Sequence, residues 1–302
     1  MRYYTDIHSY QGNRNTAVTL GKFDSLHRGH QKLIGRVKLY AREAQAESVV
    51  FSFDMGQKSL LTNEERRAHL EEQVDCMIQC PFTKAIREME AETFIKDILA
   101  EKLHASYIVV GRDFHFGHGK RGDVHMLAEY AHRYHYHLEV LDKELHDGRE
   151  ISSTYVREAL SSGEVELANE LLGYAYHTSG VVEHGRRLGR TLGFPTMNVA
   201  PPERKFMPRS GVYACRVRID SVWYSGIGNV GTKPTVTEKQ RLLTEVYVFD
   251  YEGNAYGKEI TVEFCAFERP ETKFGSVEEL KAQVDRDIAF GKQYFQKADL
   301  VV

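Results

Sequence analysis

Two side chains with neutral oxygen donors stand at alternate positions in residues 191–199, TLGFPTMNV. In an extended segment alternate side chains point to one face, so the Thr196 hydroxyl and the Asn198 amide can converge on one ligand. Neutral oxygens suit a Mg²⁺ ion that is held mostly by water and by substrate phosphates. The spacing therefore predicts a metal-assisted phosphate site that contains Thr196 and Asn198.

The loop before this segment, residues 184–193 (HGRRLGRTLG), combines glycines with arginines. Glycine lets the backbone approach a phosphate closely, and arginine neutralises the phosphate charge. Ordinary turns can have the same composition. The loop is interpreted as a phosphate-binding loop only because the segment that contains Thr196 and Asn198 follows it. The residues expected to contact nucleotide here are Gly185, Gly189, Arg190, Thr191, Gly193 and Pro195.

A pair of histidines follows a short apolar segment near the N-terminus. Residues 15–20 (NTAVTL) predict a strand that enters a glycine turn, and His27 and His30 then stand at the opening of a helix. Unpaired N–H groups and the dipole of a helix start favour an anion. Two imidazoles there can hold triphosphate oxygens and stabilise charge on a phosphorus under attack. The alternative is a pair of surface histidines.

Residues 151–160 (ISSTYVREAL) place hydroxyls at a second predicted helix start. Hydroxyls and N–H groups can bind a phosphate there, and an arginine one turn inside can bridge it. The alternative is a helix cap with more hydroxyls than it needs. The residues concerned are Ser152, Ser153, Thr154 and Arg157. A doubly wound sheet would bring them beside the histidine pair.

Glu245 interrupts an apolar strand in LLTEVYVFDYEGNAYG, residues 242–257. An ionised side chain there must point to water or into a site. Facing Thr196 and Asn198 inside a barrel, it could take the proton of a primary alcohol that attacks a γ-phosphate. Exposure on an edge strand is the alternative, and Asp250 is the nearest rival carboxylate.

Alternating strand and helix patterns in the first half indicate the scaffold for the histidines. Thr62 followed by Glu65 predicts a capping box at one helix start. Strands are expected at residues 15–20, 48–53, 75–80, 107–110 and 137–141. Strand and helix at this spacing favour an α/β domain with a parallel, Rossmann-like sheet. Ligands bind such sheets at the carboxyl ends of the strands, where His27, His30 and Asp113 would fall.

From residue 176 the pattern changes to short β-branched and aromatic runs separated by turns. Strands are expected at residues 176–183, 211–219, 222–230, 243–251 and 259–267. Without helices between them, they predict a small antiparallel barrel. A terminal helix at 277–295 would pack Leu280, Val284, Ile288 and Phe295 inward. We expect two domains, residues 1–173 and 174–302.

Composition narrows the class of protein. The 302 residues are 42% apolar and 27% charged, with a net charge of −3, which gives no electrostatic case for nucleic-acid binding. No apolar run reaches 18 residues, and the N-terminus lacks the signal-peptide pattern. The four scattered cysteines predict buried thiols in a reducing compartment rather than a zinc site. We expect a soluble, cytoplasmic protein that binds neither membrane nor nucleic acid.

Several motifs in this order resemble the prokaryotic bifunctional riboflavin kinase/FAD synthetase family, and the resemblance covers nearly the whole chain. They are GKFDSLHRGH (21–30), VGRDFHFG (110–117), ISSTYVR (151–157), GRTLGFPTMN (189–198), GIGNVGTKPT (226–235), the strand around Glu245, and ERPETKFGSVEEL (268–280). Each motif alone is only suggestive, whereas the ordered set is specific.

The resemblance implies two activities that use ATP. The first half is similar to nucleotidyltransferases of the HxGH type, which would move AMP from ATP to FMN, form FAD and release pyrophosphate. The second half is similar to a flavokinase barrel, which would transfer the γ-phosphate of ATP to the ribityl 5′-hydroxyl of riboflavin. The implied substrates and products are ATP, riboflavin, FMN and FAD, and Mg²⁺ is the implied cofactor.

The resemblance also implies roles for individual residues. His27 and His30 would stabilise the adenylyl transition state, and Glu245 would be the catalytic base of the kinase. Thr196 and Asn198 would hold Mg²⁺ and nucleotide. The implied nucleotide site of the first half adds Gly21, Phe23, Asp24, Gly29 and Asp113 to the hydroxyls and arginine of residues 152–157, and the implied flavin site comprises Asn229, Arg269 and Phe274.

Three features of the first half depart from the family pattern. Ser25 stands where the family usually has glycine, FSFDMGQKS at 51–59 lacks the usual proline and histidine, and His115 replaces a basic residue. They leave open an alternative, a riboflavin kinase whose first half binds nucleotide with little or no catalysis. A flavin- or nucleotide-sensing binding protein is the alternative of another class.

Overall fold

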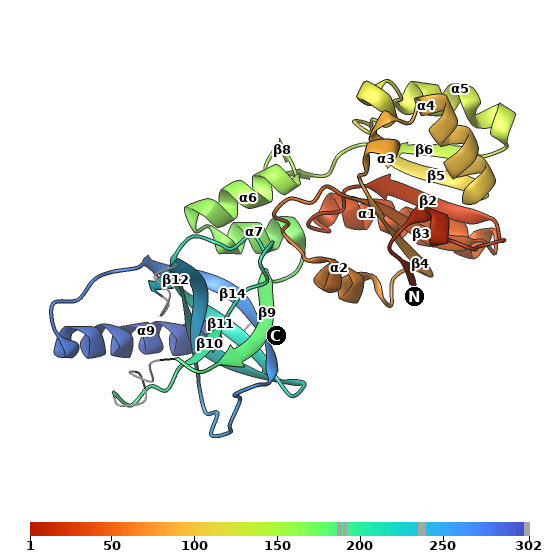
Figure 1. Cartoon of the computed structure of the whole chain (residues 1–302). Helices are drawn as coiled ribbons and strands as arrows, with labels where there is room; N and C mark the ends of the chain where they lie inside the picture. The colour runs from red at the N-terminus through yellow and green to blue at the C-terminus, as the bar shows by residue number, and fades with distance from the viewer. Residues whose placement is uncertain (186–188, 190–191, 235–239, 299–302) are drawn as a thin grey trace. The chain divides into compact units, whose positions relative to one another are not determined.

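The computed structural model describes residues 1–185, 189, 192–234 and 240–298. Its contacts divide the chain into two compact units, Met1–Ser153 and Thr154–Val302. The first unit contains a parallel sheet with helices on both faces, and the second contains a closed antiparallel barrel (Figure 1). The predicted combination of an α/β half and a β-barrel half is confirmed.

The sheet of the first unit has six parallel strands in the order β1-β4-β3-β2-β5-β6. The strands are β1 (Arg2–Tyr4), β2 (Thr16–Gly21), β3 (Glu47–Asp54), β4 (Cys76–Pro81), β5 (Ala105–Gly111) and β6 (His137–Leu141). Because β2 and β5 are parallel neighbours, the loops that follow Gly21 and Gly111 leave the sheet at the same edge. This edge carries the first candidate site.

Helices cover both faces of this sheet, as the continuous apolar strands require. Ala17 of β2 packs with Val37 of α1 on one face, whereas Val18 and Leu20 pack on the other with Ile98 of η2. The helices of the unit are η1 (Ile7–Ser9), α1 (Arg28–Glu43), α2 (Asn63–Leu70), α3 (Lys84–Glu88), α4 (Ala91–Thr93), η2 (Phe94–Lys102), η3 (His118–Lys120) and α5 (Val124–Tyr134).

The local signals of the first unit differ in how well they predicted structure. The Thr62/Glu65 capping box at the start of α2 is confirmed in both directions, because each side chain accepts a backbone N–H of the other residue. Residues 91–93 form the short helix α4, which continues from residue 94 as the π-helix η2. The strand β1, the helix α3 and the hairpin of β7 (Leu145–His146) and β8 (Arg149–Glu150) were not predicted, because they are too short to show a periodic pattern.

The barrel of the second unit closes in the order β10-β13-β12-β11-β14-β9, with antiparallel neighbours throughout. Its strands are β9 (His177–Glu183), β10 (Met197–Val199), β11 (Gly211–Ile219), β12 (Val222–Pro234), β13 (Gln240–Val248) and β14 (Glu259–Pro270). The five predicted strands are confirmed. The sixth, β10, forms within the segment expected to be extended, and it closes the barrel between β9 and β13.

The described residues of the second unit include three helices, α6 (Ser153–Ser162), α7 (Val165–Leu172) and α9 (Val277–Ala298), although α6 begins at the last residue of the first unit. Asn169 ties α7 to the barrel, because its Nδ2 donates to the Phe264 carbonyl of β14 at 2.9 Å. The helix α9 packs on β11 and β12. Its predicted inward residues Leu280, Val284, Ile288 and Phe295 are half-buried, while Asp287 is only 2% exposed.

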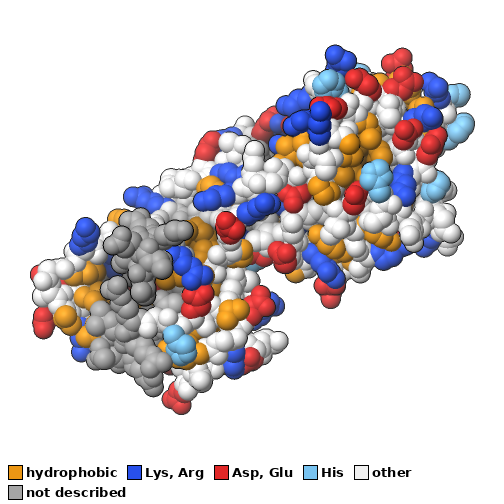
Figure 2. Space-filling model, in the orientation of Figure 1, with side chains coloured by type: hydrophobic (Ala, Val, Ile, Leu, Met, Phe, Trp, Pro, Cys, Tyr) orange, Lys and Arg blue, Asp and Glu red, His pale blue; other side chains and the backbone are white. Residues whose placement is uncertain are grey.

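The charged side chains on the surface and the burial of the four cysteines bear on the expectations drawn from composition. On the face drawn in Figure 2, basic and acidic side chains are interspersed over the described residues. All four cysteines are free and buried, as predicted. Among the described residues, no helix combines the length and the apolar character needed to cross a membrane.

Candidate active sites

The turn between β2 and α1 brings the two histidines to the carboxyl edge of the sheet. The strand ends at Gly21, and α1 begins after its N-cap residue, His27. Phe23 and Leu26 in this turn have φ values of 45° and 46°, a region that side chains other than glycine rarely adopt. Both residues are buried, so packing holds the turn in a conformation that costs energy.

The rings of His27 and His30 stack, with centroids 3.7 Å apart and planes 13° from parallel. Nδ1 of His27 accepts the backbone N–H of His30 at 3.3 Å, so a neutral His27 carries its proton on Nε2. Burial lowers the pKa of His27 to about 4, and it holds the pKa of His30 well below the usual value. At neutral pH both rings are therefore uncharged, and each offers one N–H donor.

Three further residues of the motif pack around these rings. The Phe23 ring centroid lies 4.9 Å from that of His30. A Cβ at Gly21 would lie 3.3 Å from the Phe23 ring, and one at Gly29 would lie 3.2 Å from the His27 ring. The two glycines thus allow the backbone to lie close against the aromatic cluster.

Residues after β3 fix the rest of the turn. Oδ1 of Asp24 accepts the N–H of Leu60 at 3.1 Å, and the Asp24 carbonyl accepts that of Leu61 at 2.9 Å. Ser25 is fully buried, and its hydroxyl lies 3.0 Å from that of Ser153. Because Ser25 does not have a positive φ, the turn accommodates a serine at this position without backbone strain there.

Asp113 follows β5, the neighbour of β2, and its negative charge acts on His27. Its Oδ2 lies 3.0 Å from Nζ of Lys143, which also binds Glu150 at 2.7 Å. These contacts raise the pKa of Lys143, the bond to Glu150 most strongly. His27 and Asp113 thus lie at the same edge of the sheet, where the strand ends were expected to place them.

The predicted second anion site is divided between the two units. Ser152 and Ser153 end the first unit, and Thr154 and Arg157 belong to the second. Ser153 reaches Ser25 in the histidine turn. Within the second unit, the guanidinium of Arg157 lies 5.4 Å from the ring centre of Phe206. A shared phosphate site of these residues stays a prediction.

In the second unit, Asn198, Glu245 and Asn229 form a row across three neighbouring strands. Glu245 of β13 is paired with Asn198 of β10 on one side and with Asn229 of β12 on the other. Directly paired residues point to the same face of a sheet and lie about 5 Å apart at Cβ. Asn198 and Glu245 are therefore close enough to act on one ligand.

The row lies on the outer face of the barrel, which corrects the expectation that Glu245 faces the interior. Its neighbours Thr244 and Val246 are fully buried, and side chains alternate along a strand. A barrel of six strands is too narrow to hold both a packed core and a substrate, so its interior is filled by side chains. The ionised carboxylate of Glu245 therefore points to the outer face of the barrel.

The glycine loop lies against the two predicted metal ligands. A Cβ at Gly185 would lie 2.2 Å from the Asn198 amide nitrogen. One at Gly189 would lie 2.5 Å from the Phe194 carbonyl and 3.4 Å from the Thr196 hydroxyl. The close approach leaves room for nothing larger than glycine. The donors gathered here are neutral oxygens, which fit a divalent cation that keeps water and phosphate as its other ligands.

The rest of this loop is described in part. Gly193 has a φ of 91°, a conformation that favours glycine, and Pro195 is exposed. The N–H of Phe194 donates to the Gly189 carbonyl at 2.9 Å and closes the loop. The predicted contacts of Arg190 and Thr191 lie outside the described residues.

A carboxylate that the sequence analysis did not single out extends the row beyond Asn198. Glu183 of β9 is paired with Asn198, and Arg241 holds its two oxygens at 2.8 and 3.0 Å. The described residues contain no group of three or more histidine, cysteine, aspartate or glutamate side chains able to bind a metal ion. An all-carboxylate metal site is therefore not among the described features.

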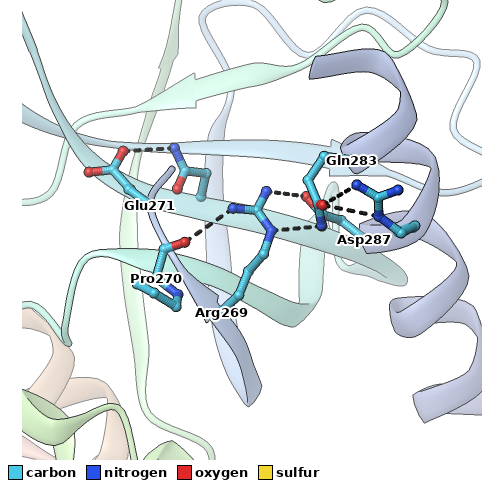
Figure 3. A network of polar contacts seen from close by, with 7 residues as sticks. Arg269, Pro270, Glu271, Gln283 and Asp287 are labelled. Carbon is cyan, nitrogen blue, oxygen red and sulfur yellow. Dashed lines mark hydrogen bonds and ion pairs between the residues drawn. The ribbon is translucent and has the colours of Figure 1, made fainter. Parts of the chain in front are cut away.

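Two of the predicted flavin residues, Arg269 and Phe274, lie where the chain leaves β14, and the third, Asn229, lies on β12. Nδ2 of Asn229 donates to Glu271 at 3.2 Å, whereas its Oδ1 is buried with no hydrogen-bond partner among the described residues. The guanidinium of Arg269 lies 5.9 Å from the ring centre of Phe274. Arg269 is also bound by Asp287 of α9 (Figure 3).

Asp287 is the residue that the sequence analysis missed in this region. Its signal was available, because a charged side chain at this position interrupts the apolar stripe of α9 between Val284 and Ile288. A buried carboxylate is unfavourable unless it pairs with a cation. The cation here is the Arg269 guanidinium, which forms an ion pair with Asp287.

Comparisons with known proteins match both units. The FAD synthetase family model matches residues 9–155, and the riboflavin kinase family model matches residues 172–295. The chain is 36% identical to the bifunctional riboflavin kinase/FMN adenylyltransferase of Haemophilus influenzae, with 92% of this chain and 94% of that protein covered. The proteins of that name in Listeria monocytogenes and Escherichia coli K12 are each 34% identical, with 94% and 92% of this chain covered and the same shares of the relatives.

The chain belongs to the bifunctional riboflavin kinase/FMN adenylyltransferase family. The resemblance drawn from the motifs is confirmed. A solved structure of a macrolide-efflux protein from Streptococcus pneumoniae shares the fold of this family member, with a TM-score of 0.86, 28% identity and coverage of 94% of this chain and 96% of that one.

The family models also bear on how the chain is organised. The matched ranges end at residue 155 and resume at residue 172, so most of α6 and most of α7 lie between them. The contacts of this family member divide at residue 153 instead, and they group both helices with the barrel. The boundary at 173/174 stays a prediction.

Proposed function

We infer that this protein phosphorylates riboflavin to FMN and adenylylates FMN to FAD. One observation carries the inference: a single chain matches both family models, one over the parallel-sheet unit and one over the barrel. ATP, riboflavin and FMN are the substrates, and ADP, pyrophosphate and FAD are the products. The free, buried cysteines support a reducing, cytoplasmic location.

In the kinase reaction, Glu245 accepts the proton of the riboflavin 5′-hydroxyl as that oxygen attacks the γ-phosphorus of ATP and ADP leaves. The row across the barrel supports this role, since Asn229 lies beside Glu245 and its buried Oδ1 suits a ribityl hydroxyl donor. Thr196 and Asn198 would hold Mg²⁺, which supplies neutralisation of phosphate charge when it is bound. The glycine loop gives the phosphates close access to both residues.

In the adenylyl transfer, an FMN phosphate oxygen attacks the α-phosphorus of ATP, and pyrophosphate leaves. His27 and His30 each contribute a neutral N–H donor to the phosphate oxygens, aided by the first N–H groups of α1. Their stacking fixes both rings in advance, so little reorganisation is needed as charge develops. Gly21, Gly29 and the turn around Asp24 support this placement.

The direct test is to incubate the protein with riboflavin, ATP and Mg²⁺ and to separate the flavins by chromatography. We expect FMN to rise first and FAD to follow. Replacing both His27 and His30 with alanine should block FAD while FMN still forms. If neither product changes in this variant, the assignment of the histidines is wrong.

The second candidate is a riboflavin kinase whose first unit does little chemistry, and the departures at residues 51–59 and 115 favour it. Asp54 accepts the Gly56 N–H at 2.8 Å, and Nδ1 of His115 lies 2.9 Å from the Asp113 carbonyl, so both segments are engaged in local contacts. FMN that accumulates without FAD, in wild-type protein, would select this candidate. Riboflavin binding without either product would select a flavin-sensing protein.

A further inference from the structure

A buried ion pair joins the end of β14 to α9 in the barrel unit. Nε of Arg269 donates to Oδ1 of Asp287 at 2.9 Å, and Nη2 donates to Oδ2 at 2.5 Å (Figure 3). The side chains are 19% and 3% exposed. A bidentate pair of this kind fixes both the position and the plane of the guanidinium.

Two neighbours on α9 hold Asp287 in place. Nε2 of Gln283 donates to Oδ1 of Asp287 at 2.7 Å (Figure 3), and Nε of Arg286 donates to the side-chain Oε1 of Gln283 at 3.0 Å. Glu268 adds a second carboxyl next to the pair, and burial and the Asp287 charge raise its pKa to about 7. The Arg269 charge is therefore matched by Asp287, with Glu268 partly protonated at neutral pH.

The pair also sets the course of the chain beyond β14. Nη1 of Arg269 donates to the Pro270 carbonyl at 3.1 Å. The next residue, Glu271, accepts the Asn229 amide of β12, and a Cβ at Gly231 would lie 2.0 Å from its Oε1. Contacts thus run from Asp287 through Arg269 and Glu271 to Asn229, the direct neighbour of Glu245.

The guanidinium keeps donors for a ligand. It has five N–H groups, and the bonds to Asp287 and Pro270 use three of them within the described part of the chain. Because Asp287 neutralises the cation, the two remaining N–H groups suit an uncharged acceptor better than a phosphate. The ring carbonyls and ribityl hydroxyls of riboflavin are uncharged acceptors.

We propose that Asp287 is a positioning residue for flavin binding, which acts by holding Arg269 and, through residues 270 and 271, Asn229. This rests on the proposed kinase function, and it adds a residue of α9 to it. Asp287 itself does not touch the flavin; it determines where the donors of Arg269 point.

The test compares Asp287→Asn with Asp285→Asn, an exposed aspartate two residues earlier on α9. Riboflavin affinity is measured directly by the quenching of flavin fluorescence, and steady-state kinetics give KM and kcat for riboflavin and for ATP. We expect Asp287→Asn to weaken riboflavin binding and raise its KM by about tenfold, the effect of losing a charge-assisted hydrogen bond. The KM for ATP should stay within about twofold, and Asp285→Asn should match wild type.

Each outcome decides the proposal. Adenylylation of added FMN serves as an internal control, and we expect it to be unchanged in Asp287→Asn. Equal losses for riboflavin and ATP, or an unchanged riboflavin affinity in a folded variant, would overturn the positioning role. Riboflavin that binds wild type without forming FMN would refute the kinase function alone, and the affinities would still test Asp287. A wild type that binds no riboflavin would overturn both.

A second variant covers the case in which Asp287→Asn does not fold. Replacing the pair by apolar residues of similar size, Arg269→Met with Asp287→Leu, removes both buried charges together, and such exchanges commonly preserve stability. We expect this variant to fold and to bind riboflavin at least about tenfold more weakly than wild type. Wild-type affinity in it would show that the pair is only structural.

Discussion

Glu245 stands alone among the proposed catalytic groups of the barrel in being able to accept a proton. Thr196, Asn198 and Asn229 around it offer hydroxyls and amides, which do not ionise near neutral pH. Asn198 and Asn229 flank it directly on the neighbouring strands. Removing the charge of Glu245 should therefore affect the chemical step far more than it affects binding.

We expect Glu245→Gln to lower kcat for FMN formation by about a hundredfold or more, because general bases contribute on this scale. Riboflavin affinity should stay within about twofold, since glutamine keeps the size and polarity of the side chain. Stopped assays with flavin separation measure the rate, and fluorescence quenching measures binding. The matched control is Glu252→Gln, an exposed glutamate after β13. A variant at position 245 that turns over like wild type would remove the assignment of the base.

The histidine turn carries a pH signature in stability. His27 has a folded pKa of about 4, whereas the usual value is 6.5, because burial disfavours the charged ring. The unfolded chain therefore binds a proton that the folded chain does not, between these pH values. The free energy of unfolding should fall as the pH drops from about 6.5 to about 4, on the order of 3 kcal/mol in total, and should show no such slope above.

Urea unfolding of wild type and His27→Gln across this pH range measures the effect. The advantage of wild type over the variant should shrink as the pH falls, because glutamine does not titrate. A difference that stays constant over the range would contradict the buried, neutral state of His27.

At the scale of elements, α2 supports the histidine turn from outside. Leu60 and Leu61, which bind Asp24, lie directly before Thr62, the N-cap of α2. The Thr62 cap thus helps to hold Leu60 and Leu61 in the position from which they bind Asp24. A less stable start of α2 should therefore disturb the geometry of the histidine turn.

Thr62→Ala should destabilise the protein by about 1 kcal/mol, because the cap of the Glu65 N–H is lost. We expect it to slow FAD formation from added FMN while FMN formation stays unchanged. Thr93→Ala is the control, since Thr93 precedes η2, is exposed and makes no side-chain cap bond. Equal effects of the two substitutions on stability and on FAD formation would contradict this coupling.

The same elements show how far sequence reasoning reaches. Local signals predicted the capping box, the motif residues and the longer strands of the sheet and the barrel, because each depends on neighbours in sequence. The pairing of Glu245 with Asn198 and Asn229 depends on strand register across the barrel, which no local pattern specifies. The outward direction of Glu245 follows from that register and from the packed interior. Strand β10 was expected only as part of an extended segment, because three residues are too few to predict a paired strand.

At the scale of the whole molecule, two chemical steps in series are assigned to separate units of one chain. The groups for adenylyl transfer named in Met1–Ser153 include His27 and His30, and those for phosphoryl transfer in Thr154–Val302 include Asn198 and Glu245. FMN is the product of one unit and the substrate of the other. Whether FMN passes through solution can be tested with variants.

A mixture of Glu245→Gln protein with the His27→Ala/His30→Ala protein should make FAD from riboflavin, although neither does so alone. The second protein supplies FMN, and the first converts it. Flavin separation over time measures the yield, and the two single preparations are the controls. FMN that accumulates in the mixture without FAD, while each protein keeps its remaining activity, would contradict exchange through solution.

Each unit contains two of the four buried cysteines, so their thiols can report on the two units separately. Cys76 and Cys80 lie on β4, whereas Cys215 and Cys265 lie on β11 and β14. Burial raises the pKa of Cys80 to about 11 and that of Cys265 to about 12, and thiolates rather than thiols are alkylated. Iodoacetamide should therefore label each pair only as fast as its own strands open. Mass spectrometry of the labelled peptides would then measure the local opening of the sheet and of the barrel separately, without any substitution in the chain.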